Sequence, residues 1–153
     1  MKAPETIVKR MVVINAAQET VWNALIKRGL AALHLLRENG YKPLKEGSTH
    51  VWYDPEDPDQ QPRLHTHVTV LAPPRRIALM AYVPSSGLPN LPNNYTAVDI
   101  ELAPGEDGRT VVRVEQGDFA AFHHGKKLAR EAGNAWVEAL IRLRERVEHE
   151  VAA

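Results

Sequence analysis

Histidines are the side chains of this chain best suited to bind a metal. His65 and His67 stand two residues apart in a strand-like segment, which places both imidazoles on one face, about 7 Å apart. Together with His50 they could hold a divalent cation. An ordinary alternation of polar and apolar faces gives the same pattern, and no third ligand has a diagnostic spacing. We therefore expect no metal site.

A second pair, His123-His124, lies at the start of a long helical pattern. An imidazole at that position could act as an acid or a base near neutral pH. A solvated helix start explains the pair without any chemistry, and we favour that interpretation.

Other catalytic and cofactor patterns are missing from the sequence. The chain has no cysteine, and Ser48, Ser85 and Ser86 fall in loop-like segments without a strand–turn–helix elbow. There is no phosphate-binding glycine loop and no dinucleotide fingerprint. The acidic run Asp54–Asp59 lacks the turn glycine and final glutamate of a calcium loop, and fits a hairpin tip. We expect no cofactor, and no catalytic constellation is recognisable.

Composition limits the class of protein and its partners. Of 153 residues, 44% are apolar and 25% charged, which is typical of one globular domain spanning residues 1–153. The 19 basic and 19 acidic residues cancel, which argues against binding to nucleic acid or to an anionic membrane. No uninterrupted apolar run approaches about 18 residues, and the first residues lack an apolar signal core. The expected location is the cytoplasm.

The last third of the chain predicts the element that would position a site. Phe122 to Val151 has the periodicity of one long amphipathic helix. Its apolar stripe consists of Ala129, Ala132, Trp136, Leu140, Leu143, Val147 and Val151. A stripe of that length must bury against something broad, and the preceding strands offer a sheet.

Earlier segments have the alternation of strands and are separated by turn residues. They are Ile7–Ile14, Tyr41–Tyr53 with an interruption near Gly47, Arg63–Leu71, Arg76–Val83, Tyr95–Ala103 and Arg109–Gln116. In the segment Arg63–Leu71, one face is predicted to carry Leu64, Thr66, Val68 and Val70, and the other His65, His67 and Thr69.

Two short helices are predicted after the first strand. Asn15 and Gln18 fit a capping box for a helix that ends near Arg28. A second helical piece is expected from Leu30 to Glu38. A run of strands bracketed by helices indicates an α+β fold rather than a parallel α/β sheet.

This order of elements resembles the START-like superfamily, also called SRPBCC, whose members have a helix-grip fold. The resemblance is carried by Ile14–Leu25 with its Val-Trp pair, Val68–Ile77 with its Pro-Pro turn, the hairpin Tyr95–Val114, and Gly133–Leu143 with the spacing Gly-x-x-Trp-x-x-x-Leu-x-x-Leu. Within the superfamily the chain is most similar to bacterial proteins like the C-terminal domain of the heat-shock chaperone ATPase activator. The segment Lys27–Leu36 departs from the family because it lacks a tryptophan-rich stretch.

The resemblance implies a curved antiparallel sheet wrapped around a long C-terminal helix, with an apolar cavity between them. A small hydrophobic ligand is the expected partner, and Tyr82, Tyr95 and Gln116 are the expected polar anchors. The other expected lining residues are Leu79, Thr96, Val98, Ile100, Val112, Val114, Phe122 and Trp136.

The long connection Pro84–Asn94 carries two apolar residues, Leu88 and Leu91, among polar ones. They could gate the cavity or contact the second subunit of a homodimer. Simple packing against the domain is the alternative.

Three functions fit this architecture. The first is the binding of a small hydrophobic molecule by a carrier or sensor, which needs only the cavity. The second is an enzyme of the cyclase or aromatase kind, which also needs an ionisable group with a shifted pKa at the cavity wall. The third, implied by the resemblance, is a chaperone-associated interaction module, which needs an exposed contact surface.

Overall fold

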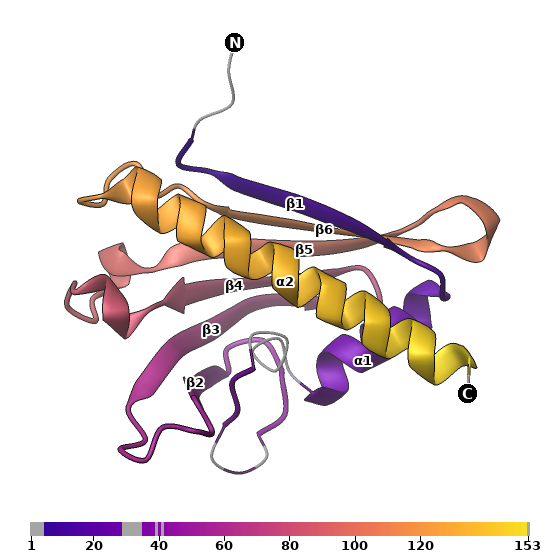
Figure 1. The fold of residues 1–153 in the computed structure, drawn as a ribbon, viewed down its shortest axis with the longest axis horizontal. Helices are drawn as coiled ribbons and strands as arrows, with labels where there is room; N and C mark the ends of the chain where they lie inside the picture. Colours follow the sequence, from indigo (N-terminus) through magenta and orange to yellow (C-terminus); the bar gives the residue numbers. More distant parts are fainter. Residues whose placement is uncertain (1–4, 29–34, 39, 41, 153) are drawn as a thin grey trace.

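A curved sheet under a long helix is the main feature of the computed structural model, which describes residues 5–28, 35–38, 40 and 42–152 (Figure 1). The sheet has six strands in the order β1-β6-β5-β4-β3-β2, and every neighbouring pair is antiparallel. The strands are β1 (Val8–Ile14), β2 (Thr49–Tyr53), β3 (Pro62–Ala72), β4 (Arg76–Tyr82), β5 (Thr96–Pro104) and β6 (Thr110–Gly117). The predicted α+β helix-grip fold is confirmed.

Two helices, α1 (Gln18–Arg28) and α2 (Gly125–Ala152), cover one face of this sheet. In Figure 1, α2 runs diagonally across the strands and α1 lies beside its C-terminal end. Short 3-10 turns, η2 (Pro84–Ser86), η3 (Pro92–Asn94) and η4 (Glu106–Gly108), occur in the connections of β4, β5 and β6. The core lies between the sheet and the helices, and its fully buried side chains include Ile14, Leu25, Ile77, Ile100, Leu102 and Leu143.

The first strand of the chain completes the sheet beside the last one. Val12 lies opposite Val112, so β1 and β6 are neighbours in the sheet although about two thirds of the sequence separates them. At Gly133, α2 passes close to β1, and a Cβ at this position would meet the flexible end of the Arg10 side chain. The helix is therefore held down on the β1 side of the sheet.

A β-bulge in β3 changes which side chains face the core. Val68 lies opposite Leu79, whereas Val70 lies opposite Ala78, so the register shifts by one residue between them. Val70 consequently falls on the outer face of the sheet, and Leu71 packs against the core instead. The prediction that Val70 shares a face with Val68 is wrong because simple alternation assumes an unbroken pleat.

The segment before β2 is not helical as predicted. Leu35 has a left-handed backbone with φ of 63°, and Arg37 forms an isolated antiparallel bridge with Tyr53. The rest of the predicted helix, residues 29–34, lies outside the described residues. The following strand begins only at Thr49, because Ser48 closes a turn with Lys45 just before it.

Contacts with distant elements replace the predicted capping box. The Gln18 side-chain amide donates to the carbonyls of Pro74 and Leu102, at 3.0 and 3.1 Å. The backbone N–H of Asn15 donates to a carboxylate oxygen of Glu148 at 2.9 Å. These bonds fix the start of α1 against the β3–β4 turn and against α2.

The long helix begins at Gly125 rather than at Phe122, because His124 has a positive φ of 59° and interrupts the helical backbone. Most of the predicted apolar stripe is buried: Ala129, Trp136, Leu140, Leu143 and Val147. Val151, at the far end of the stripe, is 55% exposed.

Candidate functional site

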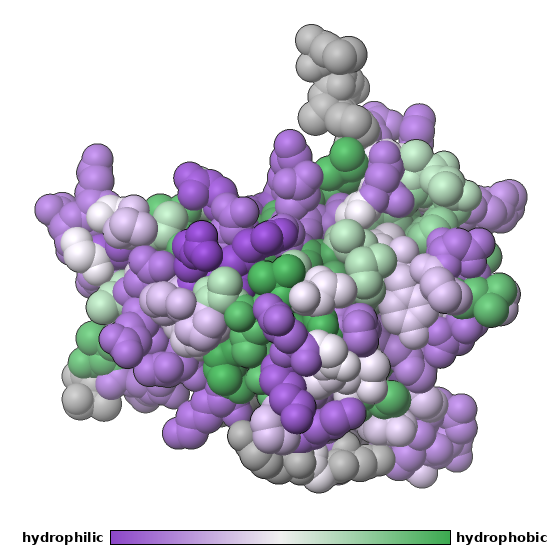
Figure 2. All heavy atoms as spheres, turned by 180° about the vertical axis from the view of Figure 1, so that it is seen from behind, coloured by the Kyte–Doolittle hydropathy of each residue, from purple (hydrophilic) through white to green (hydrophobic). Residues whose placement is uncertain are grey.

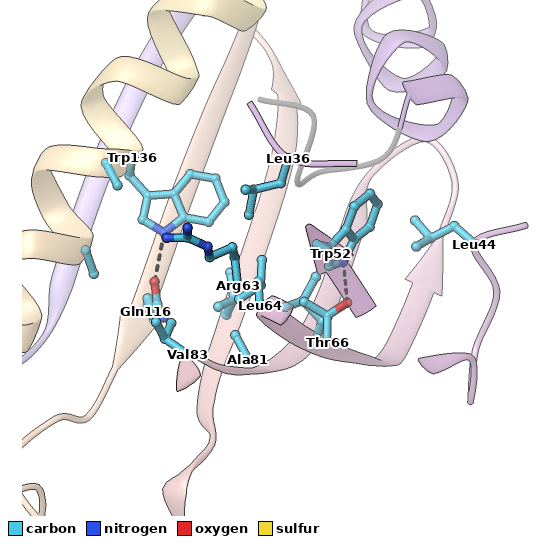
Figure 3. A pocket seen from close by; sticks show the side chains of 14 residues that line it. Leu36, Leu44, Trp52, Arg63, Leu64, Thr66, Ala81, Val83, Gln116 and Trp136 are labelled. Carbon is cyan, nitrogen blue, oxygen red and sulfur yellow. Dashed lines mark hydrogen bonds between the residues drawn. The ribbon is translucent and has the colours of Figure 1, made fainter. Parts of the chain in front are cut away.

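An apolar cleft of about 190 Å³ opens between α2 and strands β2 to β6 (Figure 3). We call it the main cleft. Trp52 from β2 and Trp136 from α2 stand on opposite sides of it. The lining residues are Leu36, Leu44, Trp52, Arg63, Leu64, Thr66, Leu79, Ala81, Val83, Val98, Gln116, Ala132, Ala135 and Trp136.

Polar groups in the wall of the main cleft bond to one another. The Trp136 indole N–H donates to the Gln116 side-chain oxygen at 2.8 Å, and the Gln116 amide donates to the Thr96 hydroxyl at 2.8 Å. The Trp52 indole N–H donates to the Thr66 hydroxyl at 3.1 Å. These bonds satisfy the buried polar atoms at little energetic cost, and they present carbon to the cleft.

A second hollow, the adjoining cleft, continues along α2 with a volume of about 240 Å³. It shares Ala81, Val83, Gln116, Ala132 and Ala135 with the main cleft, and Gln116 therefore stands at the boundary. Its further apolar lining comes from Phe119, Phe122 and Leu128.

The structure distributes the predicted lining residues over three places. Leu79, Val98, Gln116 and Trp136 line the main cleft, while Thr96 and Phe122 line the adjoining cleft together with Gln116. Ile100, Val112 and Val114 are at most 2% exposed and belong to the closed core, outside both clefts. The core is closed at these residues, whereas the main cleft extends toward β2 and β3 and the adjoining cleft extends toward the start of α2.

Tyr82 and Tyr95 do not face either cleft, which corrects their prediction as polar anchors. Each stands one residue from an inward-facing position, Ala81 or Thr96, and strand alternation turns both rings to the outer side. The Tyr82 hydroxyl donates to the Leu88 carbonyl at 2.6 Å, and the two rings stack at 5.4 Å. Together they hold the Pro84–Asn94 connection.

That connection packs against the domain through one of its two leucines. Leu88 is half-buried, whereas Leu91 is 50% exposed. Neither residue lines a cleft. No contact with a cleft therefore supports the hypothesis that these leucines gate the cavity.

Trp52, Leu64 and Arg63 line the main cleft but were absent from the predicted lining. Leu64 lies on the face of β3 that the alternation predicted to be apolar. Trp52 follows His50 by two residues in β2, so both side chains face the same side of the sheet. The sequence placed Trp52 in a predicted strand, but no local pattern indicated which face of the sheet it would take.

Arg63 is the charged group of this lining, and its partner is Asp57 in the β2–β3 loop. The Arg63 Nη2 lies 3.5 Å from Asp57 Oδ2. The backbone N–H groups of Asp59 and Gln61 donate to the same carboxylate at 3.0 and 3.2 Å. These contacts, the Asp59 N–H foremost, hold the pKa of Asp57 below its ordinary value of 3.8.

Ser48, His50 and Glu38 form a hydrogen-bonded row beside the main cleft. Nε2 of His50 lies 2.8 Å from Ser48 Oγ, and Nδ1 lies 2.9 Å from Glu38 Oε2. The order is that of a serine hydrolase. However, the Ser48 hydroxyl is buried and donates to the Lys45 carbonyl at 2.6 Å. The row therefore ties the Glu38 segment to β2, and His50 stacks on Trp52.

The histidines that could have formed a metal site lie on opposite faces of the sheet. His50 faces the same side as Trp52, whereas His65 and His67 lie opposite Tyr82 and Met80 on the outer side. Within the described ranges, no group of three His, Cys, Asp or Glu residues could hold a metal ion.

His123 and His124 are exposed just before α2, with ring centroids 3.9 Å apart. Neither lines the main or the adjoining cleft. Their position matches the solvated helix start that the sequence favoured.

The outer face of the sheet is shown in Figure 2, where apolar side chains gather in the middle and polar ones surround them. Arg76 on β4 and Asp99 on β5 form an ion pair there, with Nη2 and Oδ2 2.6 Å apart. The hydrogen bond to Asp99 raises the pKa of Arg76 above its ordinary value. This pair joins two neighbouring strands on the side away from the clefts.

The fold and the cleft define a helix-grip protein of the START-like superfamily. A model of the family described as "Activator of Hsp90 ATPase homolog 1-like protein" matches residues 15–148. The chain therefore belongs to this family, and the predicted resemblance is confirmed. The search of curated proteins found no match.

Three similar solved structures share the fold over almost their whole length. Protein ChR145 from Cytophaga hutchinsonii is 25% identical, with 96% of this chain and 97% of that chain covered and a TM-score of 0.72. Protein MLL2253 from Mesorhizobium loti is 18% identical, with 94% and 97% covered and a TM-score of 0.70. The Aha1 dimer from Colwellia psychrerythraea is 17% identical, with 93% and 96% covered and a TM-score of 0.69. The last two show the fold alone.

None of the helices in the described part of the chain combines the length and the apolar character that a membrane span requires.

Proposed function

We propose that this protein binds a small hydrophobic molecule in the main cleft, as a carrier or a sensor. The observation that carries the proposal is the cleft between Trp52 and Trp136, whose wall is apolar and whose polar atoms already have partners. Apolar and aromatic walls with few polar groups are typical of sites for small molecules.

The size of the cleft limits the ligand. Binding sites for drug-sized molecules occupy about 300–1,000 Å³, and an apolar cavity of about 150 Å³ holds one benzene ring. With about 190 Å³, the main cleft accommodates a body of roughly one ring. A longer molecule would extend past Gln116 into the adjoining cleft.

Native mass spectrometry of freshly purified protein tests this proposal, followed by thermal shifts across a panel of small apolar compounds. A matched pair of variants locates the site. Ala135 lines both clefts, whereas its exposed neighbour Asn134 lines neither. Ala135→Trp should fill the space and abolish the ligand mass and the shifts, while Asn134→Trp should retain both. An apo mass with no shift for any compound would contradict the proposal.

The enzyme alternative finds little support in the cleft. An acid or base is needed at the wall. Among the described residues that line the main cleft, the charged one is Arg63, whose guanidinium is a hydrogen-bond donor and no base. The carboxylate in the lining of the adjoining cleft is Glu131. The two tyrosines that could have transferred a proton lie on the outer side.

A second candidate function is a chaperone-associated interaction module, which the family description favours. The test is the ATPase rate of a heat-shock protein 90 with and without this protein. Stimulation that is equally strong with Ala135→Trp would support a module that works without a ligand. No stimulation by the wild-type protein would contradict it.

We also propose a second copy of this chain as a partner, since the neighbour from Colwellia psychrerythraea is a dimer. Leu91, 50% exposed in the β4–β5 connection, is the residue through which contact is expected. Light scattering should give twice the mass of one chain, reduced to one by Leu91→Glu. A monomer mass for the wild type would contradict the proposal.

A further inference from the structure

Arg63 gives the rim of the main cleft a charge. Among the described residues that line the cleft, it alone is ionised, and its side chain is 50% exposed. In Figure 3 it extends from β3 toward Trp136. The guanidinium can therefore meet a group at the mouth of the cleft while remaining in contact with solvent.

The interior of the cleft has no comparable group to offer. Its two indole N–H groups already donate to Gln116 and Thr66. No buried side-chain polar atom in the described part of the chain lacks a hydrogen-bond partner. A polar group of a ligand placed inside would lose its water without replacement, so the interior suits carbon.

Arg63 itself has unused hydrogen-bonding capacity. A guanidinium has five N–H donors, and the described contact of Arg63 is a single one of 3.5 Å to Asp57. The Asp57 carboxylate is meanwhile bound by the N–H groups of Asp59 and Gln61. The loop thus satisfies Asp57 from its own backbone, and Arg63, with its side chain half exposed, has donors left for a ligand.

We propose that the main cleft binds a small apolar monocarboxylate, with its body between Trp52 and Trp136 and its carboxylate on Arg63. Arginine binds carboxylates with two parallel hydrogen bonds. One guanidinium beside the negative Asp57 matches a single negative charge and disfavours a dianion such as a phosphate monoester. This inference names the ligand class for the proposed function and rests on it.

The test compares two probes of similar size, 3-phenylpropionate and the neutral 3-phenylpropan-1-ol. Both are titrated calorimetrically into the wild type, Arg63→Gln, Arg63→Lys and Arg109→Gln. Arg109 is the control, because it is exposed in the β5–β6 hairpin and lines neither cleft. Circular dichroism confirms that each variant is folded.

For the wild type we expect tighter binding of the acid than of the alcohol, with an affinity that falls as salt is added. Arg63→Gln should weaken the acid about tenfold and change the alcohol less than about twofold. Arg63→Lys should weaken binding of the acid less than Arg63→Gln does, because lysine keeps the positive charge. It should still weaken this binding, because lysine cannot donate two parallel hydrogen bonds. Arg109→Gln should bind both probes as the wild type does.

Two results would overturn the carboxylate site while the cleft remains a binding site. One is equal binding of acid and alcohol by the wild type, and the other is an Arg63→Gln variant that binds both probes unchanged. If neither probe binds the wild type, the proposed function fails and the carboxylate site fails with it.

Discussion

At the scale of single residues, Gln116 decides how polar the clefts are. It is 8% exposed, and its amide both accepts from Trp136 and donates to Thr96. Gln116→Met keeps the length of the side chain but leaves the indole N–H without this acceptor. We expect a loss of about 1–3 kcal/mol in the free energy of unfolding, measured with urea. The control Gln61→Met, in the exposed loop, should cost less than about 0.5 kcal/mol. Equal losses for the two variants would contradict the role of Gln116.

Asp57 gives the β2–β3 loop a dependence on pH. Its pKa lies below 3.8 in the folded protein, first because of the Asp59 N–H. Because the pKa of Asp57 is lowered in the folded protein, its charged form stabilises the loop. This stabilisation is complete at pH values above the pKa that Asp57 has in the unfolded chain. This contribution is lost as the pH falls through the folded pKa. Carbon-detected NMR should give an Asp57 midpoint below 3.8, accompanied by shifts of the Asp59 and Gln61 amides. A midpoint at or above 3.8 would exclude these hydrogen bonds.

Local patterns placed some residues of the site and missed others for physical reasons. Trp136 lines the main cleft. Its face of the helix could be predicted because helical periodicity is a local property of the sequence. Tyr82 was predicted to line the cavity because of its residue type. The type of a residue does not determine which face of the sheet its side chain takes. Trp52 and Arg63 depend on the pairing of β2 with β3 across an irregular loop, which no local pattern reports.

At the scale of elements, we predict opposite effects on stability for alanine substitutions at the two buried glycines of α2. A Cβ on Gly125 would overlap the backbone carbonyl of Phe119, which cannot move aside easily. On Gly133 it would meet only the flexible end of Arg10. Gly125→Ala should therefore destabilise by about 1–3 kcal/mol. Gly133→Ala should be neutral or stabilise by up to about 1 kcal/mol, because alanine favours helix. Thermal unfolding of both variants checks this, and a reversed order would contradict the close approach of Gly125 to the Phe119 carbonyl.

The order and type of most elements could be predicted because their periods of two or 3.6 residues persist over whole segments. The exceptions are set by distant contacts. Gln18 bonds to Pro74 and Leu102 rather than to its own helix end, and Arg37 pairs with Tyr53 where a helix was expected. The bulge after Val68 likewise depends on the pairing with β4.

At the scale of the whole molecule, a straight helix lies on a curved sheet and cannot touch all of it. Near β1, α2 packs closely, with Gly133 against Arg10. Toward β2 and β3 the two layers separate, and the main cleft forms there. The sequence predicted such a space between sheet and helix, but not that Ile100, Val112 and Val114 would lie in the closed part.

The three tryptophans allow a direct test of the claim that the main cleft binds a small apolar molecule. Trp52 and Trp136 line it, whereas Trp22 belongs to α1, is buried in the core and lines neither cleft. The indole N–H signals in a nitrogen–proton NMR spectrum are followed as 3-phenylpropionate is added. We predict saturable shifts of the Trp52 and Trp136 signals with one common dissociation constant, and a stationary Trp22 signal. If all three signals stay in place, or if Trp22 moves while the other two do not, the cleft is not the binding site.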